Sequence, residues 1–370
     1  MRKSGYQPLG KYIEQVNVRN RDLTVTNLMG VSIEKRFIPS IANTIGTDLS
    51  PYKIVKPGQF AYGPVTSRNG DKITIALYNG NEDCIISQAY EAFRIKDTTQ
   101  LLPEYLMMWA KRPEFDRYAR YMSHGSVREL FSWEEMCNVM LPVPPIEEQR
   151  RIVSEYQTVE RRIANNEALI QKLEETAQAI YHHTFVEGID EENLPEGWRK
   201  GCLEEVTICF DSKRKPVAGY DRTGKKSIYP YYGATSIMDY VDDYIFDGEY
   251  ILMGEDGSVV TEDGKPYLQY VRGKIWVNNH AHILQGKGLY NNNILYWSLN
   301  NTIIQNYITG AVQLKLNQQN MNSIPVIIPD ENTLIKIQKI LNPITDYIYC
   351  LNKDIGLLKK LLSLLTSKLS

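Results

Sequence analysis

Cysteine is scarce and scattered in this sequence of 370 residues. The five cysteines are odd in number and form no CxxC pair, which argues against a disulfide framework and a structural zinc site. No apolar run approaches the roughly 18 residues of a membrane span. The chain also reaches Lys11 without the apolar stretch of a secretory signal. These absences predict a protein of the reducing cytoplasm that has no contact with a membrane.

An excess of one charge is also missing. The 42 basic and 44 acidic residues give a net charge of −2, so any nucleic-acid-binding surface must be a local patch. Apolar residues make up 43% and charged residues 23%, as in folded globular proteins, and the length suggests two or three domains of roughly 100–200 residues. Tyrosine is abundant, with 25 residues against 8 phenylalanines. Tyrosine suits a recognition surface because it combines flat contact area with a hydrogen-bonding group.

Motifs of catalysis are missing as well. The segments 5–12 and 219–226 resemble a phosphate-binding loop, but both lack the Ser or Thr that holds magnesium. There is no GxGxxG and no Asn/Asp-Pro-Pro-aromatic run of the kind that amino-methyltransferases use. His280 and His282 stand two positions apart on a predicted strand, which puts both on one face without an obvious third metal ligand, so we expect a packed or hydrogen-bonded pair. The sequence therefore supports no catalytic and no metal-binding residues.

A repeat of 185 residues organises the chain. Nine seam positions between Ile152 and Ile180 recur between Ile337 and Leu365, at alternating steps of four and three. A sustained period of 3.5 residues is the signature of a coiled coil, in which a narrow apolar seam packs against a second helix. We therefore expect two long helices that pair with each other.

The two seams differ at two places. Asn166 stands where the second seam has Leu351, and a buried Asn costs stability but can fix the register of a helix pair. Asn342 and Pro343 interrupt the second seam, and proline is tolerated in the first turn of a helix after an Asn cap. We therefore expect the second long helix to begin near Pro343, after a short separate turn.

The repeat extends upstream of both helices. The segment 124–127 (HGSV) is echoed by 309–312 (TGAV), and a short amphipathic segment around Trp109 by another around Trp297. The regions before them are rich in strand-like runs punctuated by Gly, Asn and Asp. Proline-rich runs then end a strand and admit a helix. The predicted layout is two mixed α/β domains, each followed by a long helix, over residues 1–145, 146–187, 188–329 and 330–370.

One segment combines basic and aromatic residues. Six basic side chains fall within residues 213–226, directly before YPYYGA at 229–234. Basic residues beside aromatic ones are typical of phosphate contact and base recognition. A solvated loop without a ligand is equally compatible with this composition.

These motifs together resemble one family, the DNA-specificity subunit of type I restriction-modification enzymes. The second half resembles its target-recognition domain in LPEGW (194–198), YPYYGATSIMDYVDDYIFDGEYILMGEDG (229–257) and WVNNHAHIL (276–284). The first half resembles another common variant of that domain in YKIVKPGQFAYGP (52–64), ISQAYEAFRI (86–95) and GSVRELFSWEEM (125–136). The first long helix starts with PPIEEQRRI (144–152), whereas the second start, IPVIIPDENTLIKI, lacks the usual Pro-Pro and Glu-Gln.

The resemblance implies an α+β fold. Two mixed α/β target-recognition domains would stand in tandem repeat, separated by two long antiparallel spacer helices that form an intramolecular coiled coil. Each domain would read one half of a split double-stranded DNA target, and because the domains differ in sequence the target should be asymmetric. At about 1.5 Å per residue the step from Ile152 to Ile180 spans about 42 Å. That length can hold two readers one turn of B-DNA apart, or roughly 34–36 Å.

The resemblance also implies partners that do the chemistry. Two methyltransferase (M) subunits would bind S-adenosylmethionine, and some complexes would add restriction (R) subunits. The chain itself would be non-catalytic, with no cofactor and no metal.

By the same resemblance, loops of each domain approach the major groove, and a Gly-containing segment lies near the backbone. The candidate contacts of the first domain are Arg68, Asn69, Ser87, Gln88, Tyr90, His124, Gly125, Ser126 and Arg128. Those of the second are Lys213, Arg214, Tyr231, Tyr232, Gly233, Asn278, Asn279, His280, Gly310 and Lys315. Gly125 and Gly310 would let backbone N–H groups approach phosphate. A purely structural role is as compatible with Tyr90, Tyr231, Asn279 and His280.

Two other classes of function stay open at this point. A single-chain methyltransferase or nuclease with an unrecognised active site is one, and S-adenosylmethionine binding by the isolated chain would favour it. A freestanding DNA-binding or structural protein is the other, and it would not co-purify with methyltransferase subunits.

Overall fold

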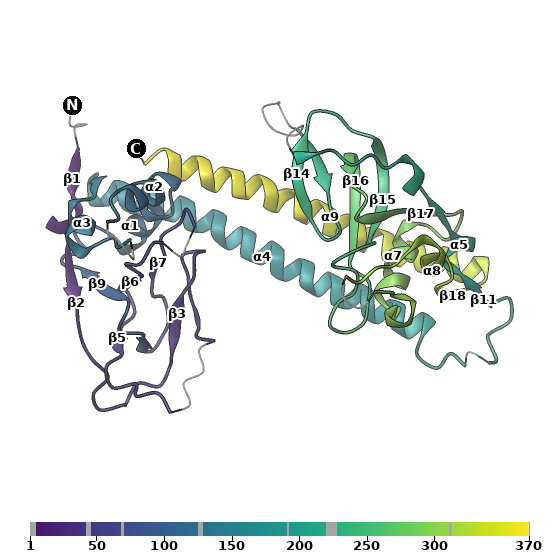
Figure 1. Cartoon of the computed structure of the whole chain (residues 1–370), viewed down its shortest axis with the longest axis horizontal. Coiled ribbons are helices and arrows are strands. Elements are labelled where there is room, and N and C mark those ends of the chain that lie inside the picture. Colours follow the sequence, from purple (N-terminus) through teal and green to yellow (C-terminus); the bar gives the residue numbers. More distant parts are fainter. Residues whose placement is uncertain are drawn as a thin grey trace. The chain divides into compact units, whose positions relative to one another are not determined.

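The computed structural model describes residues 5–41, 46–67, 70–124, 129–190, 192–219, 228–310 and 313–369. The chain divides into two compact units (Figure 1). The first unit comprises Met1–Asn165 together with Ile355–Ser370, and the second comprises Asn166–Asp354. Each unit therefore contains one strand-rich domain and a part of each long helix.

In each half of the chain, a strand-rich region and short helices precede a long helix, as the repeat predicts. The strands of the first unit are β1 (Tyr6–Pro8), β2 (Ile13–Val16), β3 (Met29–Val31), β4 (Phe37–Pro39), β5 (Lys53–Val55), β6 (Phe60–Tyr62), β7 (Ile75–Leu77), β8 (Cys84–Ile86), β9 (Glu91–Ile95) and β10 (Met140–Pro142). Those of the second are β11 (Arg199–Cys202), β12 (Thr207–Cys209), β13 (Tyr229–Tyr232), β14 (Ile237–Val241), β15 (Phe246–Gly254), β16 (Leu268–Val277), β17 (Ala281–Gly286) and β18 (Pro325–Ile328). The α-helices are α1 (Pro103–Ala110), α2 (Pro113–Tyr121), α3 (Trp133–Asn138), α4 (Ile146–Phe185), α5 (Leu203–Val206), α7 (Asn292–Asn300), α8 (Gln318–Asn322) and α9 (Glu331–Ser367). Short 3-10 turns cover η1 (Leu9–Lys11), η2 (Asp211–Lys213) and η3 (Gln305–Tyr307).

The first unit is built on an antiparallel sheet in the order β2-β9-β6-β7. Because side chains alternate along a strand, its two faces differ. Phe60 and Phe93 stack 4.8 Å apart on the face whose core includes residues of α1 and α2, whereas Ala61 and Ala92 point the other way. The small alanines let the short strands β3, β5 and β8 contribute to a second core on that face.

The second unit has a larger sheet, in the order β12-β17-β15-β16-β13-β14. Here Ile251 and Met253 of β15 face a core that includes α7 and parts of both long helices. Tyr250 and Leu252 alternate with them and face a separate apolar cluster. The sheet therefore separates the helical side of the unit from the side where η2 begins.

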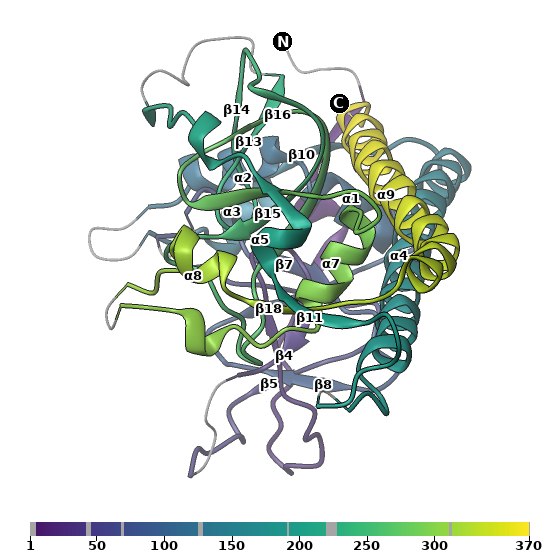
Figure 2. The same cartoon turned by 90° about the vertical axis from the view of Figure 1, so that its right-hand side faces the viewer.

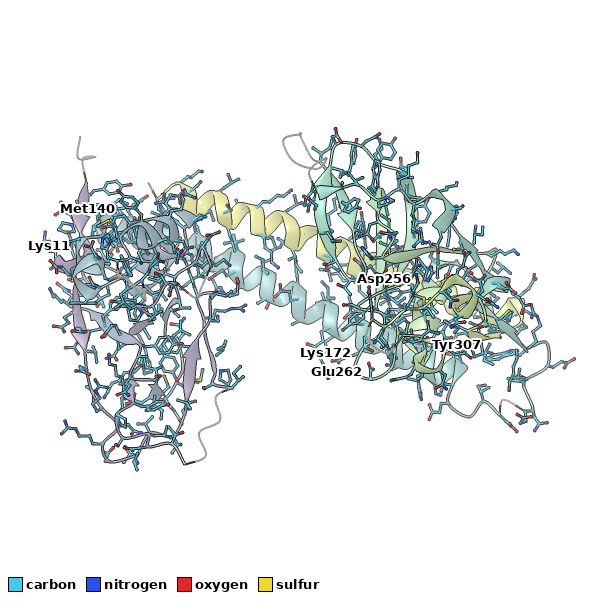
Figure 3. All side chains as sticks on the ribbon, in the orientation of Figure 1. Lys11, Met140, Lys172, Asp256, Glu262 and Tyr307 are labelled. Atoms are coloured by element: carbon cyan, nitrogen blue, oxygen red, sulfur yellow. The ribbon has the colours of Figure 1, made fainter. Side chains whose placement is uncertain are left out.

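Each unit has its own two-stranded antiparallel ribbon, and the two ribbons are equivalent. In the first, β1 pairs antiparallel with β10, so that Pro8 lies opposite Met140, which is labelled in Figure 3. In the second, β11 pairs antiparallel with β18. In both units the later strand runs directly into a long helix, as the proline-rich runs predict.

The two long helices pack along the predicted seam within each unit (Figures 1 and 2). Tyr156 of α4 joins Leu362 and Leu369 in the core of the first unit. In the second, Ala177 of α4 joins Ile337 of α9. All eighteen seam positions are buried or half-buried, and most residues between them are exposed. The seam and the antiparallel coiled coil are therefore confirmed.

Asn166, the polar residue of the seam, forms a hydrogen bond with the other long helix. The Asn166 side-chain amide donates to Asp354 Oδ2 at 2.9 Å. This bond satisfies Asn166 in one register of the helix pair only, which fits its predicted role in fixing that register.

The start of α9 differs from the sequence-based expectation. The helix begins at Glu331 and continues through Pro343 to Ser367, so the prediction that it starts near Pro343 was wrong. Asp330 caps it, because its carboxylate accepts the Thr333 amide at 3.0 Å and the Thr333 hydroxyl at 2.5 Å. Pro343 removes one helical hydrogen bond, and both Pro343 and Lys339, whose carbonyl loses its partner, are exposed residues.

Among the described helices, none combines the length and apolar character needed to cross a bilayer.

Candidate nucleic-acid interface

The Gly-containing loop before each long helix is closed in the same way in both units. His124 and Leu130 exchange two backbone hydrogen bonds of 3.2 and 3.0 Å. Thr309 and Lys315, each 185 positions later, exchange the same two bonds at 2.8 and 2.7 Å. The repeat noticed in HGSV and TGAV is therefore a repeated loop closure in three dimensions.

Gly310 adopts a conformation that side chains rarely allow. Its φ is +91°, and a Cβ added there would lie 2.1 Å from the Gln313 carbonyl oxygen. The loop 309–315 therefore requires glycine at this position.

The first unit presents its described candidates on two segments. Ser87, Gln88 and Tyr90 lie on a turn in which the Tyr90 amide donates to the Ser87 carbonyl at 3.1 Å. Lys53 stabilises this turn, because its buried ammonium donates to the Tyr90 carbonyl at 2.6 Å. His124 is exposed at the base of its loop. Five predicted residues of this unit lie outside the described part of the chain: Arg68, Asn69, Gly125, Ser126 and Arg128.

A cavity of about 430 Å³ adjoins that turn. Val31, Ile33, Pro64, Ala89 and Tyr90 supply most of its apolar wall. Ser32 and Thr74 also line it. Sequence reasoning identified only Tyr90 here, because the other residues come from four segments with no shared motif.

The candidates of the second unit divide by exposure. Lys213, Asn279, Gly310 and Lys315 are exposed, and Tyr232, Arg214 and His280 are half-buried. Tyr231, Gly233 and Asn278 are buried, so these residues can support a surface but cannot lie on it. The Tyr231 hydroxyl, for example, accepts the Val217 amide at 3.1 Å.

Three segments carrying these candidates meet at an ionic cluster, which consists of Asp211, Arg214, Glu255, His282 and Lys315. Arg214 is only 14% exposed in its side chain and pairs with the carboxylates of Glu255 and, at 3.3 Å, Asp211. It also donates to the Ala281 carbonyl at 2.9 Å. Lys315 lies 3.6 Å from the other Glu255 oxygen. Arg214 therefore connects these segments through ion pairs and a hydrogen bond beneath the surface.

His282 lies at the centre of the cluster and is fully buried. Its Nδ1 lies 2.5 Å from Asp211 Oδ2 and its Nε2 lies 2.7 Å from the Leu316 carbonyl oxygen. Burial alone would raise the pKa of the Asp211 carboxyl, but the hydrogen bond and charge of His282 outweigh it and hold that pKa below its ordinary value.

His280 has a different environment from His282. It precedes β17 rather than lying within it, its side chain is 44% exposed, and its Nδ1 pairs with Asp256, which is labelled in Figure 3. The sequence-based expectation that both imidazoles share one strand face was therefore wrong, because the strand begins one residue after His280.

Asp211, Glu255 and His282 could offer ligand atoms to a metal ion, since these atoms lie within 4.8 Å of one another. Both nitrogens of His282 already face hydrogen-bond acceptors, and Arg214 and Lys315 place two cations against the carboxylates. A divalent cation would have to displace these groups, so the arrangement is that of an ion-pair network.

Comparison with known proteins decides the family. The model of the type I restriction modification DNA specificity domain matches residues 34–175 and 195–360, one match in each half of the repeat. The chain belongs to this family. Both specificity domains include the long-helix segments that follow the strand-rich regions.

Individual relatives agree with the specificity-domain assignment. A "putative type I restriction enzyme specificity subunit", S.HindORF215P of Haemophilus influenzae, is 37% identical over 164 residues. That alignment covers 44% of this chain and 41% of the relative, so less than half of either protein. The crystal structure of a type I restriction-modification S subunit from M. genitalium superposes with a TM-score of 0.59 at 14% identity, over 98% of this chain and 95% of that one. This second likeness shows the shared fold.

Sequence reasoning missed the acidic half of the ionic cluster. Asp211, Glu255 and Asp256 lie beneath basic or aromatic candidates, and a search for DNA contacts passes over carboxylates because they repel phosphate. No local motif links these carboxylates to the histidines, because Asp256 and Asp211 are 24 and 71 positions away from the imidazoles that they contact.

Proposed function

We propose that this chain is the DNA-recognition subunit of a type I restriction-modification complex and is itself non-catalytic. The observation that carries the proposal is the pair of identical loop closures, at residues 124–130 and 309–315, in two specificity domains of different sequence. Backbone N–H groups in such glycine loops suit phosphate, and the side chains of neighbouring loops suit base edges.

Because the two domains differ in their loops, each reads a different half of a split target. The first presents Ser87, Gln88 and Tyr90, and the second presents Lys213, Asn279 and Lys315. The target is therefore asymmetric. The seam step from Ile152 to Ile180, about 42 Å at 1.5 Å per residue, fits half-sites about one turn of duplex apart.

Two methyltransferase subunits are the proposed partners, with restriction subunits in some complexes. The exposed side of α9 supports this part of the proposal. Ile340 and Tyr347 in the second unit, and Leu357, Leu361 and Leu364 in the first, are exposed apolar side chains one position before the seam. A second apolar stripe beside a filled seam suits the binding of another amphipathic helix. S-adenosylmethionine belongs in those subunits, and the complex works in the cytoplasm.

The proposal is tested by selecting bound duplexes from a random library. The selection uses the full chain together with its co-expressed methyltransferase subunits. We expect two different short half-sites separated by unread positions, and methylation at the same sequence in the source genome. A palindromic target contradicts the two-reader assignment. S-adenosylmethionine binding by the isolated chain favours a single-chain methyltransferase, and failure to co-purify with methyltransferase subunits favours a freestanding DNA-binding protein.

A further inference from the structure

The protonation state of His282 follows from its neighbours. Both ring nitrogens lie within hydrogen-bonding distance of oxygen acceptors, a carboxylate at 2.5 Å and a backbone carbonyl at 2.7 Å. Neither acceptor can donate a proton when Asp211 is ionised, so both nitrogens must donate. The buried ring is therefore an imidazolium cation.

Its two acceptors connect separate segments of the second unit. Asp211 stands in η2, beside Lys213, and also accepts the Ile283 amide of β17 at 2.9 Å. Leu316 directly follows Lys315, the residue that closes the glycine loop. The ring thus joins the segment of Lys213 to the loop of Gly310 by two hydrogen bonds from its opposite sides.

The third segment is attached through Glu255. Its carboxylate lies 3.7 Å from His282 Nδ1 and pairs with Arg214, and its backbone amide donates to the His280 carbonyl at 2.9 Å. Its own carbonyl accepts the Leu316 amide at 2.8 Å. The turn of Asn279 and His280 is therefore held by the same cluster.

Among the buried groups, the charges balance while the ring is protonated. Two carboxylates, Asp211 and Glu255, face two buried cations, Arg214 and His282, and the partly exposed Lys315. The other titratable pair nearby is His280 with Asp256, on the exposed side. Loss of one proton from His282 would turn a ring lone pair toward an acceptor oxygen, and one of the two hydrogen bonds of the ring would be lost.

We propose that His282 is a positioning residue for DNA recognition, which as an imidazolium fixes the three segments that carry Lys213, Asn279 and Lys315. This inference rests on the proposed function and adds to it a residue that touches no DNA.

The test uses the full chain and duplexes carrying the selected target or a base change in one half-site. His282→Gln keeps one donor but removes the charge and one hydrogen bond. We expect it to reduce discrimination by about tenfold or more at one half-site, the one affected by Lys315→Ala, and to leave the other unchanged. His183→Gln, an exposed imidazole paired with Glu187, is the matched control and should change neither.

Two further measurements separate positioning from a loss of folding. In the ¹⁵N spectrum of histidine-labelled protein near neutral pH, we expect both ring nitrogens of His282 to carry protons. In His282→Gln, a cooperative unfolding transition in urea should remain, so that the lost discrimination reports positioning and not unfolding.

A singly protonated His282 ring, or full discrimination at both half-sites in His282→Gln, overturns the inference. If the wild type binds all duplexes equally, the proposed function fails instead. The two failures are thus distinguishable.

Discussion

At the scale of single residues, the first unit depends on one buried ion pair. Lys35 lies 2.8 Å from Asp116, and both side chains are almost fully buried. Lys35 also donates to the Ala110 carbonyl at the end of α1, and Asp116 accepts the Ile73 amide at 3.1 Å. Burial lowers the pKa of Lys35, although the hydrogen bond and charge of Asp116 oppose that shift. The pair ties the turn after β3 to two helices.

Breaking this pair should destabilise the first unit. Lys35→Met leaves the Asp116 charge buried without a cation, and we expect the free energy of unfolding in urea to fall by about 3 kcal/mol. The double variant Lys35→Met/Asp116→Asn removes the charge but keeps an oxygen for the Ile73 amide. It should recover most of the loss, and equal stability of the two variants would contradict this account.

Gly310 should be required for the shape of the loop. In Gly310→Ala, the new Cβ meets the Gln313 carbonyl and the positive φ becomes strained, so the closure by Thr309 and Lys315 must shift. We expect a stability loss of about 1 kcal/mol but a large drop in DNA affinity, measured by titration at several salt concentrations. Gly288→Ala is the control, because Gly288 has a φ of +60° with nothing within 4 Å of an added Cβ. Equal affinity losses in the two variants would show that the Gly310 loop has no special role.

At the scale of elements, the long helices show what a sequence can predict. The seam positions were predictable because helical periodicity depends on neighbours in sequence. The start of α9 was not predictable, because it depends on the cap that Asp330 provides and on the exposed position of Pro343. A proline in a helix is tolerable where its unpaired carbonyl meets water, and exposure is a tertiary property.

Pro343→Ala should therefore stabilise the second unit. The substitution restores one backbone hydrogen bond in the interior of α9 without disturbing the seam, because the position is exposed. We expect a gain of about 1–3 kcal/mol in the free energy of unfolding, measured by urea denaturation. Pro329→Ala, just before the helix, should give a much smaller change. A loss of stability on Pro343→Ala would mean that the proline shapes α9 for another reason.

The candidate interface was predictable in part for the same reason. The loop residues around Gly310 and His124 emerged from the repeat, which is visible in sequence. The role of Arg214 beneath the surface was not predictable. Basic residues in contact with DNA and basic residues in buried ion pairs look alike in sequence. Only the arrangement of Asp211 and Glu255 around it distinguishes the two.

At the scale of the whole molecule, assembly with methyltransferase subunits should depend on the outer side of α9. Leu357, Leu361 and Leu364 are 57%, 41% and 60% exposed. The double variant Leu357→Lys/Leu361→Lys should keep the wild-type melting temperature but reduce co-purification with the methyltransferase subunit about tenfold or more. Lys360→Glu, exposed on the same helix, is the control. Unchanged assembly in the double variant would place the partner elsewhere.

The first unit is discontinuous in sequence, and this has a consequence for biosynthesis. Its core includes Leu362 and Leu369, which the ribosome adds only after the whole second unit. The amino-terminal domain therefore emerges early yet cannot complete its packing until Leu369 has been added, while the second domain has all its residues by Asp354. Domains usually fold in order of synthesis, but here the second can mature before the first. A chain that terminates before Leu362 would leave the early domain unfinished and open to proteolysis, so few one-armed chains would survive to compete for the proposed methyltransferase partners.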